Sequence, residues 1–339
     1  MRAVGYQTSL PIEDPKSLVD IDLPKPVPTG RDLLVEVRAV SVNPVDTKVR
    51  KRAAPAPGQW KVLGWDAAGT VVAVGPQVSL FKPGDEVFYA GALERAGTDA
   101  ELHLVDERIV GKKPASLSFA EAAALPLTAI TAWETLFDRL DVKKLVPGAA
   151  PSILVIGGAG GVGSITIQLL RKLTDLTVIA TASRAETQDW VRALGAQHVV
   201  DHRKPIAAQV AALGLGAPGL VFSTTNTDTH LGEIAELIAP QGRFALIDDP
   251  AGFDIALFKR KSVSIHWESM YTRSTFQTAD MAAQGVLLNE VARLVDAGSL
   301  KTTLAENFGT INAANLKRAH ALLESGTARG KIVLEGFAG

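Results

Sequence analysis

The 339-residue sequence contains no cysteine. This absence excludes disulfides, thiolate nucleophiles, iron–sulfur clusters and zinc sites built on cysteine. An excess of one charge is also missing, because 35 Lys and Arg residues balance 36 Asp and Glu residues. We therefore expect neither nucleic acid nor an anionic membrane surface as the main partner.

Long uninterrupted apolar runs are absent as well. The opening MRAVGYQTSLPIEDP lacks the apolar core of a secretory signal, and proline and glycine interrupt the longest uncharged run, Leu145–Leu170. Charged residues make up 21% and hydrophobic residues 47%, a balance typical of folded chains with a large core. We expect a cytoplasmic globular protein of about two domains, with no membrane span.

The first third of the chain is rich in short β-type runs. Leu33–Val42 partly alternates apolar and polar residues, and the run 69–75 (GTVVAVG) is bounded by glycine. The sequence Lys82-Pro83-Gly84-Asp85 has turn chemistry and precedes a further strand-like run, Glu86–Tyr89. Residues 1 to about 120 are therefore predicted to be β-rich with many turns.

From about residue 152 to residue 265, strand-like runs alternate with helix-like runs. The expected strands and helices are, in order, Ser152–Ile156, Gly161–Leu173, Thr177–Thr181, Ala185–Leu194, His198–Val200, Leu220–Ser223, His230–Ile238 and Arg243–Ile247. Such alternation is typical of βαβ units and predicts a parallel sheet. Further on, Gly285–Ala297 and Ala313–Glu324 are predicted helices and Lys331–Leu334 a final strand.

A glycine-rich turn follows the first strand of this region. Gly158, Gly160 and Gly163 form G-x-G-x-x-G between a strand and a helix, which is the context that a dinucleotide site requires. We expect Gly158 to permit the tight turn, Gly160 to admit a pyrophosphate, and Gly163 to let the helix pack against the strand. The N–H groups of Gly161 and Val162 would then face the anion at the helix N-terminus. The alternative is a glycine-rich turn without a ligand.

The end of the second strand bears on which dinucleotide binds. An NAD site usually has a carboxylate there, but this chain has Ser183 and Arg184, and its first carboxylate is Glu186. A hydroxyl and a guanidinium suit a 2′-phosphate, so the pair predicts NADPH as the cofactor. The alternative is that Arg184 is a solvated residue at a helix start.

The order of these regions resembles the medium-chain dehydrogenase/reductase superfamily, and within it the zinc-free quinone oxidoreductase branch and proteins called zinc-type alcohol dehydrogenase-like. The segments that carry the resemblance are 41–46 (SVNPVD), 63–71 (LGWDAAGTV), 83–87 (PGDEV), 125–129 (LPLTA) and 330–334 (GKIVL). The resemblance implies an α/β fold with a doubly wound Rossmann sheet and a β-rich GroES-like catalytic domain. The catalytic domain would comprise residues 1–122 and 266–339, and the cofactor domain residues 123–265. It also implies a homodimer.

The sequence departs from the zinc alcohol dehydrogenases at their metal site. Where those enzymes carry Gly-His-Glu, this chain has Gly64-Trp65-Asp66, and it has no thiolates for a catalytic or structural zinc. We therefore expect no metal site. The resemblance implies hydride transfer from NADPH to a quinone or an α,β-unsaturated carbonyl as small-molecule substrate. The alternative is a non-catalytic NADPH-binding redox sensor or interaction protein.

The resemblance also suggests site residues, and all of them except Asn43 have a plainer alternative. Asn43 would lie near the nicotinamide, and Lys48 would stabilise a developing enolate unless it is a solvated lysine. Thr128 would bond the cofactor unless a backbone carbonyl satisfies its hydroxyl. His202 would lie near the adenine, or at the surface. Lys331 would contact the cofactor, or be a solvated strand residue.

Three aromatic residues, Trp65, Trp267 and Tyr271, are expected either to shape the acceptor pocket or to pack in the core. Tyr271, Lys48 and solvent are the candidate proton donors. The basic clusters 50–52 (RKR) and 259–261 (KRK) are expected to be solvated, with cofactor phosphate as an alternative partner for the second.

Overall fold

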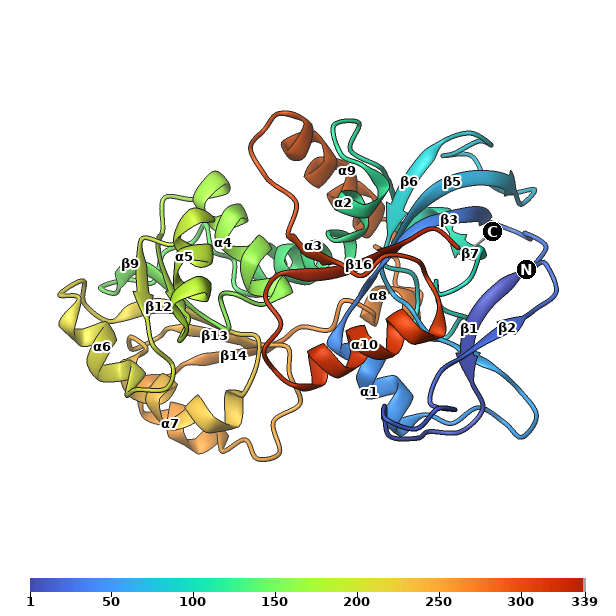
Figure 1. Ribbon diagram of the computed structural model, residues 1–339. Helices are drawn as coiled ribbons and strands as arrows, with labels where there is room; N and C mark the ends of the chain where they lie inside the picture. The colour runs from blue at the N-terminus through green and yellow to red at the C-terminus, as the bar shows by residue number, and fades with distance from the viewer. Residues whose placement is uncertain (338–339) are drawn as a thin grey trace. The chain divides into compact units, whose positions relative to one another are not determined.

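The computed structural model describes residues 1–337, which form two compact units (Figure 1). Of the described residues, unit 1 comprises 1–130 and 271–337, and unit 2 comprises Thr131–Met270. The chain therefore leaves unit 1 after Ile130 and returns to it at Tyr271. Among residues 1–337, no helix combines the length and the apolarity that crossing a bilayer requires.

Unit 1 is built on two sheets whose strand pairs are antiparallel, except for the parallel pair β15–β16. Its strands are β1 (Arg2–Tyr6), β2 (Val19–Asp22), β3 (Asp32–Val42), β4 (Lys61–Val62), β5 (Ala67–Val74), β6 (Glu86–Tyr89), β7 (Leu102–Asp106), β8 (Val110–Lys112), β15 (Leu304–Asn307) and β16 (Lys331–Glu335). Its helices are α1 (Pro44–Arg52), α2 (Phe119–Ala123), α8 (Thr272–Thr275), α9 (Ala283–Asp296) and α10 (Ala313–Glu324), with a short η1 (Glu107–Ile109). Helix α3 (Pro126–Trp133) begins in this unit.

The larger sheet of unit 1 brings the C-terminal strand beside the long strand β3. The strand order is β15-β16-β3-β5-β6-β8, with β7 also paired to β3. Strands β16 and β3 are antiparallel, and their register pairs Ile332 with Val42. Lys331 and Asn43, nearly 290 residues apart in the sequence, therefore lie side by side where β3 ends.

Unit 2 is a parallel sheet flanked by helices (Figure 1). The strands are β9 (Ala150–Ile156), β10 (Thr177–Thr181), β11 (His198–Val200), β12 (Pro218–Ser223), β13 (Arg243–Leu246) and β14 (Ser264–Trp267). The order is β11-β10-β9-β12-β13-β14. The helices are α4 (Gly161–Leu173), α5 (Ala185–Ala193), α6 (Ile206–Ala212) and α7 (Thr227–Leu237), with the shorter η2 (Glu134–Arg139) and η3 (Ile255–Lys261). The predicted Rossmann alternation and the β-rich first region are confirmed.

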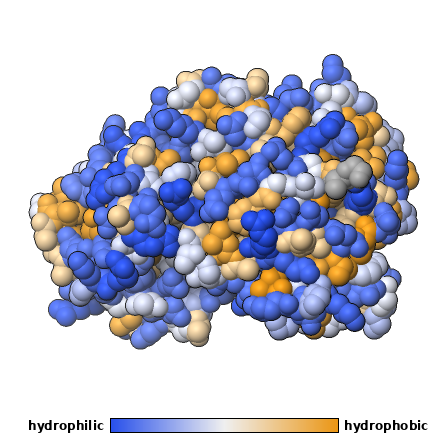
Figure 2. All heavy atoms as spheres, viewed as in Figure 1, coloured by the Kyte–Doolittle hydropathy of each residue, from blue (hydrophilic) through white to orange (hydrophobic). Residues whose placement is uncertain are grey.

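The two faces of the parallel sheet supply the core of unit 2. On one face, Leu154, Ile179, Val221 and Phe244 lie in register on four neighbouring strands and are fully buried, and on the other face the same holds for Val155, Ala180, Phe222 and Ala245. Strands covered on both faces have nearly continuous apolar sequences, which explains the β-branched runs. On the face shown in Figure 2, hydrophilic residues predominate, and apolar residues come to the surface in scattered groups.

The expectation of solvated basic clusters is wrong at Arg50, and a residue of the second cluster, Lys261, is only partly exposed. Arg50 is fully buried, pairs with Glu324 and donates to His320 Nδ1 at 3.3 Å, so it ties α1 to α10. Lys261 donates to the carbonyls of Glu236 and Ile238 and thereby caps the C-terminal end of α7. A run of like charges did not reveal these partners, because they lie far away in the sequence.

Candidate active site

The glycine-rich turn connects β9 to α4, and its backbone shows what each glycine does. Gly157 has φ of +78°, so the tight turn falls there and not at Gly158 as the motif suggested. A Cβ on Gly158 would lie 2.9 Å from Ala180 Cβ on β10, so this position needs glycine for packing. A Cβ on Gly163 would lie 2.3 Å from Gly157 O, which confirms the close helix–strand approach.

Gly160 has a different environment. A Cβ there would meet nothing nearer than Gly157 O at 3.5 Å, so the chain itself leaves room for a side chain. Gly160 is the N-cap of α4, and the N–H groups of Gly161 and Val162 follow it in the first turn, where helical N–H groups have no intrahelical acceptor. Space and unsatisfied donors together suit an anion.

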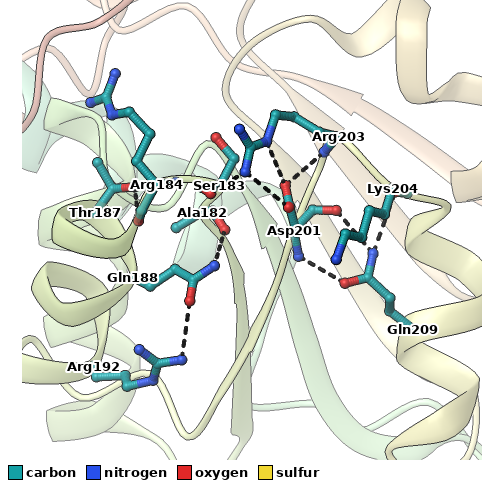
Figure 3. A network of polar contacts seen from close by, with 10 residues as sticks. All are labelled: Ala182, Ser183, Arg184, Thr187, Gln188, Arg192, Asp201, Arg203, Lys204 and Gln209. Atoms are coloured by element: carbon teal, nitrogen blue, oxygen red, sulfur yellow. Dashed lines mark hydrogen bonds and ion pairs between the residues drawn. The ribbon is translucent and has the colours of Figure 1, made fainter.

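The loops after β10 and β11 carry Arg184 and Arg203, and in Figure 3 the guanidinium group of Arg203 lies against Ser183, whereas that of Arg184 points away from it. Arg184 Nε pairs with Glu186 at 2.7 Å. Arg203 donates to the carbonyl oxygen of Ser183 at 2.5 Å and pairs with Asp201 at 3.2 Å. Ligands of open α/β sheets bind at the carboxyl ends of the strands, where both loops lie. Sequence reasoning missed Arg203, although it follows β11 as closely as Arg184 follows β10.

A glutamine side chain of α6 fixes the backbone of the loop that carries Arg203. Gln209 of α6 accepts from the backbone N–H of Asp201 at 2.9 Å and donates to its carbonyl at 2.9 Å (Figure 3). His202 lies between Asp201 and Arg203, half-buried, with its ring 6.4 Å from that of His230. Burial and the nearby charge of His230 lower the pKa of His202. The pKa shift favours the neutral form of the ring.

In unit 1, Lys331 and Asn43 join Asp66 in a buried polar cluster. Lys331 Nζ lies 3.0 Å from Asp66 Oδ2, donates to Val42 O at 3.0 Å and contacts Asn43 Oδ1. Asn43 Nδ2 donates to Asp66 Oδ2 at 2.9 Å and to Ser41 O at 3.3 Å. An ammonium has three donors, and all three of Lys331 are used inside unit 1. The alternative that Lys331 is a solvated strand residue is therefore wrong.

A second carboxylate, Asp46, borders this cluster. It accepts from Asn43 N at 2.7 Å and from Gly64 N at 3.0 Å. Burial raises the pKa of Asp46 to about 7, against the effect of these bonds and of the Lys331 charge. In the sequence, Asp46 stands out only as part of the segment 41–46, and Asp66 only as part of the segment 63–71 and of the Gly-Trp-Asp that replaces Gly-His-Glu. Their clustering depends on β3, α1 and β5 meeting at one point, which no local pattern encodes.

Helix α3 adds a backbone contact to the cluster. Leu127 N donates to Asp66 Oδ1 at 2.8 Å, and the hydroxyl of the next residue, Thr128, donates to Leu125 O at 3.1 Å. The plainer alternative for Thr128 is thus what the structure shows, with a lone pair left as acceptor. Lys48 lies partly exposed on α1, whose buried residues are Asp46, Thr47 and Arg50.

The three aromatic residues belong to two different units. Trp65 is buried, donates from Nε1 to Ala92 O at 3.1 Å, and packs edge-to-face with Tyr271 at 6.5 Å between ring centroids. Trp267 instead ends β14 in unit 2, where its side chain is 54% exposed and lies 6.0 Å from the Phe253 ring. The unit 1 pair therefore lies by the polar cluster, and Trp267 lies at a sheet edge.

Known proteins match this chain over nearly its whole length. Residues 29–131 match the alcohol dehydrogenase GroES-like domain, and residues 194–334 match the zinc-binding dehydrogenase family. A zinc-type alcohol dehydrogenase-like protein of Staphylococcus aureus (strain MSSA476) is 39% identical, over 98% of this chain and 99% of the relative. The chain belongs to the medium-chain dehydrogenase/reductase superfamily. Its resemblance to that superfamily is confirmed, and it is an oxidoreductase.

Two further members of the superfamily are informative. The crystal structure of a putative zinc-dependent alcohol dehydrogenase protein from Rhizobium etli CFN 42 is 70% identical, with a TM-score of 0.98, and covers 100% of this chain and 98% of its own. The 2-methylene-furan-3-one reductase of Solanum lycopersicum is 41% identical over 89% of this chain and 71% of the relative. The first name implies zinc and the second names no metal. The question is therefore whether the side chains of this chain could bind zinc.

The buried side chains of this member of the superfamily do not fit a catalytic zinc. Trp65 stands where the zinc-dependent members carry histidine, and the chain has no thiolate. Both oxygens of Asp66 and both of Asp46 already accept hydrogen bonds from protein donors. Within residues 1–337, no three His, Asp or Glu side chains are grouped so that they could hold a metal.

Proposed function

We propose that the protein transfers a hydride from NADPH to a quinone or an α,β-unsaturated carbonyl and needs no zinc. The observation that carries the proposal is the Lys331–Asp66–Asn43 cluster, in which an internal ammonium compensates the charge of the buried carboxylate. When bound, the nicotinamide supplies the hydride. The chain would bind and orient it and exclude water.

The missing Lewis acid favours a conjugated acceptor. Oxidising an alcohol requires its oxygen to be stabilised as it loses a proton, a role that zinc fills in the zinc-dependent relatives. A conjugated carbonyl or quinone already spreads the incoming negative charge onto its own oxygen. The name of the tomato relative, a furanone reductase, supports the same class of acceptor.

Arg184 and Arg203 support NADPH over NADH. Both arginines follow the carboxyl ends of neighbouring strands, Arg203 contacts the Ser183 carbonyl, and the fork geometry of guanidinium suits a phosphate. The carboxylate of Asp201 is paired with Arg203. It is therefore not free to accept a hydrogen bond from a ribose hydroxyl, as the carboxylate of an NAD site does.

The deciding experiment measures NADPH oxidation by purified protein after metal removal, with a panel of quinones and enones. We expect turnover by protein that retains less than about 0.1 mole of zinc per mole of chain. Added zinc should not increase the rate. Turnover that requires restored zinc would contradict the proposal. NADPH binding without oxidation by any acceptor would instead favour a redox sensor.

We also propose that two copies pair through β14. This strand is at the end of the sheet, and within residues 1–337 it pairs only with β13. The strand edge and the exposed Trp267 offer a self-complementary surface for a two-fold dimer. Light scattering should give a dimer for the wild type and for F276D, which changes an exposed residue of unit 1, and a monomer for W267D. A dimeric W267D would contradict this arrangement.

A further inference from the structure

The chain has three tyrosines, and their hydroxyl groups differ in one respect. Tyr6 Oη donates to Ala53 O at 2.7 Å. Tyr89 Oη lies 3.1 Å from His103 Nδ1, and since His103 Nε2 faces the Ala96 carbonyl at 2.9 Å, the tyrosine is the donor. Tyr271 is 7% exposed, and its Oη has no hydrogen-bond partner anywhere in residues 1–337.

An unsatisfied buried hydroxyl costs free energy that phenylalanine would not cost at the same place. Buried tyrosines normally find a partner for the hydroxyl, as Tyr6 and Tyr89 do. The exception therefore points to a partner that is not part of the chain. The position supports this, because Tyr271 packs edge-to-face on Trp65, whose indole is fixed by its bond to Ala92.

The surroundings of Tyr271 keep its proton in place. Burial, and then the charges of Asp46, Asp66 and Glu94, raise the pKa of Tyr271 well above its ordinary value. A phenol that does not ionise is a neutral hydrogen-bond donor. It suits an oxygen on which negative charge develops during a reaction.

Three site residues predicted from the sequence in unit 1 have already used donors inside the protein. Lys331 and Asn43 bond within their cluster, and the Thr128 hydroxyl donates to Leu125 O. We propose that Tyr271 Oη donates a hydrogen bond to the carbonyl oxygen of the acceptor. This rests on the proposed function, which supplies the acceptor.

The electron balance of the step assigns Tyr271 a stabilising role. The hydride with its electron pair adds to the β-carbon of the acceptor, and the π electrons move to the carbonyl oxygen. The hydrogen bond from Tyr271 Oη to this enolate oxygen becomes shorter, and the covalent O–H bond of the tyrosine does not break. Water then protonates the α-carbon. For a quinone, Tyr271 Oη would donate the same hydrogen bond to the oxygen that becomes a phenolate when the hydride adds.

The first test is stability, because it separates this role from a structural one. Tyr271→Phe should unfold at the same urea concentration as the wild type or at a higher one, since no hydrogen bond inside the protein is lost. Tyr89→Phe and Tyr6→Phe, the matched controls, should each unfold at a lower concentration. A Tyr271→Phe variant that loses as much as the controls would show that the hydroxyl has a structural partner, and would overturn the proposal.

The second test uses 4-nitrophenol, whose phenolate mimics the enolate oxygen and absorbs visibly, in the presence of NADP+. In the wild type and in Tyr6→Phe, the bound phenol should ionise at least one pH unit lower than in Tyr271→Phe. Equal ionisation in the wild type and Tyr271→Phe, or no binding to the wild type, would overturn the proposal. This titration needs no turnover, so it stands even if no acceptor is reduced.

Turnover provides the third readout. If the wild type reduces an acceptor, Tyr271→Phe should lower kcat by roughly 10²–10³-fold with unchanged NADPH affinity. An unchanged kcat would overturn the role of Tyr271 and leave the proposed function intact. A wild type that reduces no acceptor, but shows the phenol shift, would instead overturn the proposed function alone.

Discussion

Lys331 Nζ lies 3.0 Å from Asp66 Oδ2, and the two side chains are 3% and 0% exposed. Removing one partner of such a pair leaves an uncompensated buried charge. We expect Lys331→Met to lower the free energy of unfolding by roughly 3–5 kcal/mol. Urea unfolding at pH 7.5 measures it.

The double variant Lys331→Met/Asp66→Asn is the control for this prediction. It has no buried charge left unpaired, and the new amide can still accept from Leu127 N. At least half of the loss should return. A single variant that loses less than about 1 kcal/mol would show that the pair contributes no more than a surface ion pair.

Gly160 and Gly163 should respond differently to alanine. At Gly163 the new methyl would lie 2.3 Å from Gly157 O, so the start of α4 must move, and we expect a loss of roughly 1–3 kcal/mol of stability. At Gly160 the nearest atom is 3.5 Å away, so the stability loss should stay below about 1 kcal/mol. Gly160→Ala should nevertheless weaken NADPH binding at least roughly tenfold, because the methyl occupies the space for the pyrophosphate. Calorimetry that finds unchanged affinity would place the cofactor elsewhere.

Arg203 should contribute to cofactor choice although no motif points to it. We expect Arg203→Ala to weaken NADPH binding roughly 10–100-fold and to leave NADH binding within about twofold, because only NADPH carries the 2′-phosphate. Arg192 is a matched control, since it lies on α5 and pairs with Asp189 at 3.2 Å. Equal losses for the two cofactors in Arg203→Ala would exclude a phosphate contact.

Local patterns were sufficient to predict most of unit 2. The helix 161–173 and the strands 177–181 and 198–200 begin and end where their periodicity and glycines indicate. Parallel strands buried on both faces have sequences that identify them, and the G-x-G-x-x-G spacing located the β9–α4 turn. Even so, the motif assigned the tight turn to Gly158, because a Gly-Gly pair does not show which residue takes the positive φ.

The polar cluster of unit 1 could not be derived in the same way. Asn43 follows β3, Asp66 precedes β5 and Lys331 begins β16, and Lys331 meets Asn43 only through the register of two strands that are distant in sequence. Arg50 illustrates the same limit, since its partner Glu324 lies on α10. A charged residue is assumed to be exposed until a distant partner is known, and the partner is given by the fold.

Two buried histidines should make the protein sensitive to acid. Burial lowers the pKa of His103 to about 4 and that of His320 to about 3, the latter with help from the Arg50 charge. Below pH 6.5 these histidines are protonated in the unfolded chain but stay neutral in the folded one. The free energy of unfolding therefore falls as pH falls, by about 1.4 kcal/mol per pH unit for each histidine.

The carboxyl group of Asp46 complicates a direct measurement of this effect. Because burial raises its pKa to about 7, folding favours its protonated form, and its contribution changes with pH in the opposite direction. The informative quantity is therefore the difference between the wild type and His103→Gln, which has no titrating group at this position. Between pH 7 and pH 5 the stability of the wild type should fall relative to His103→Gln by roughly 2 kcal/mol, and adding His320→Gln should roughly double that change. Parallel stability curves from urea unfolding at several pH values would show that His103 takes up its proton equally in both states.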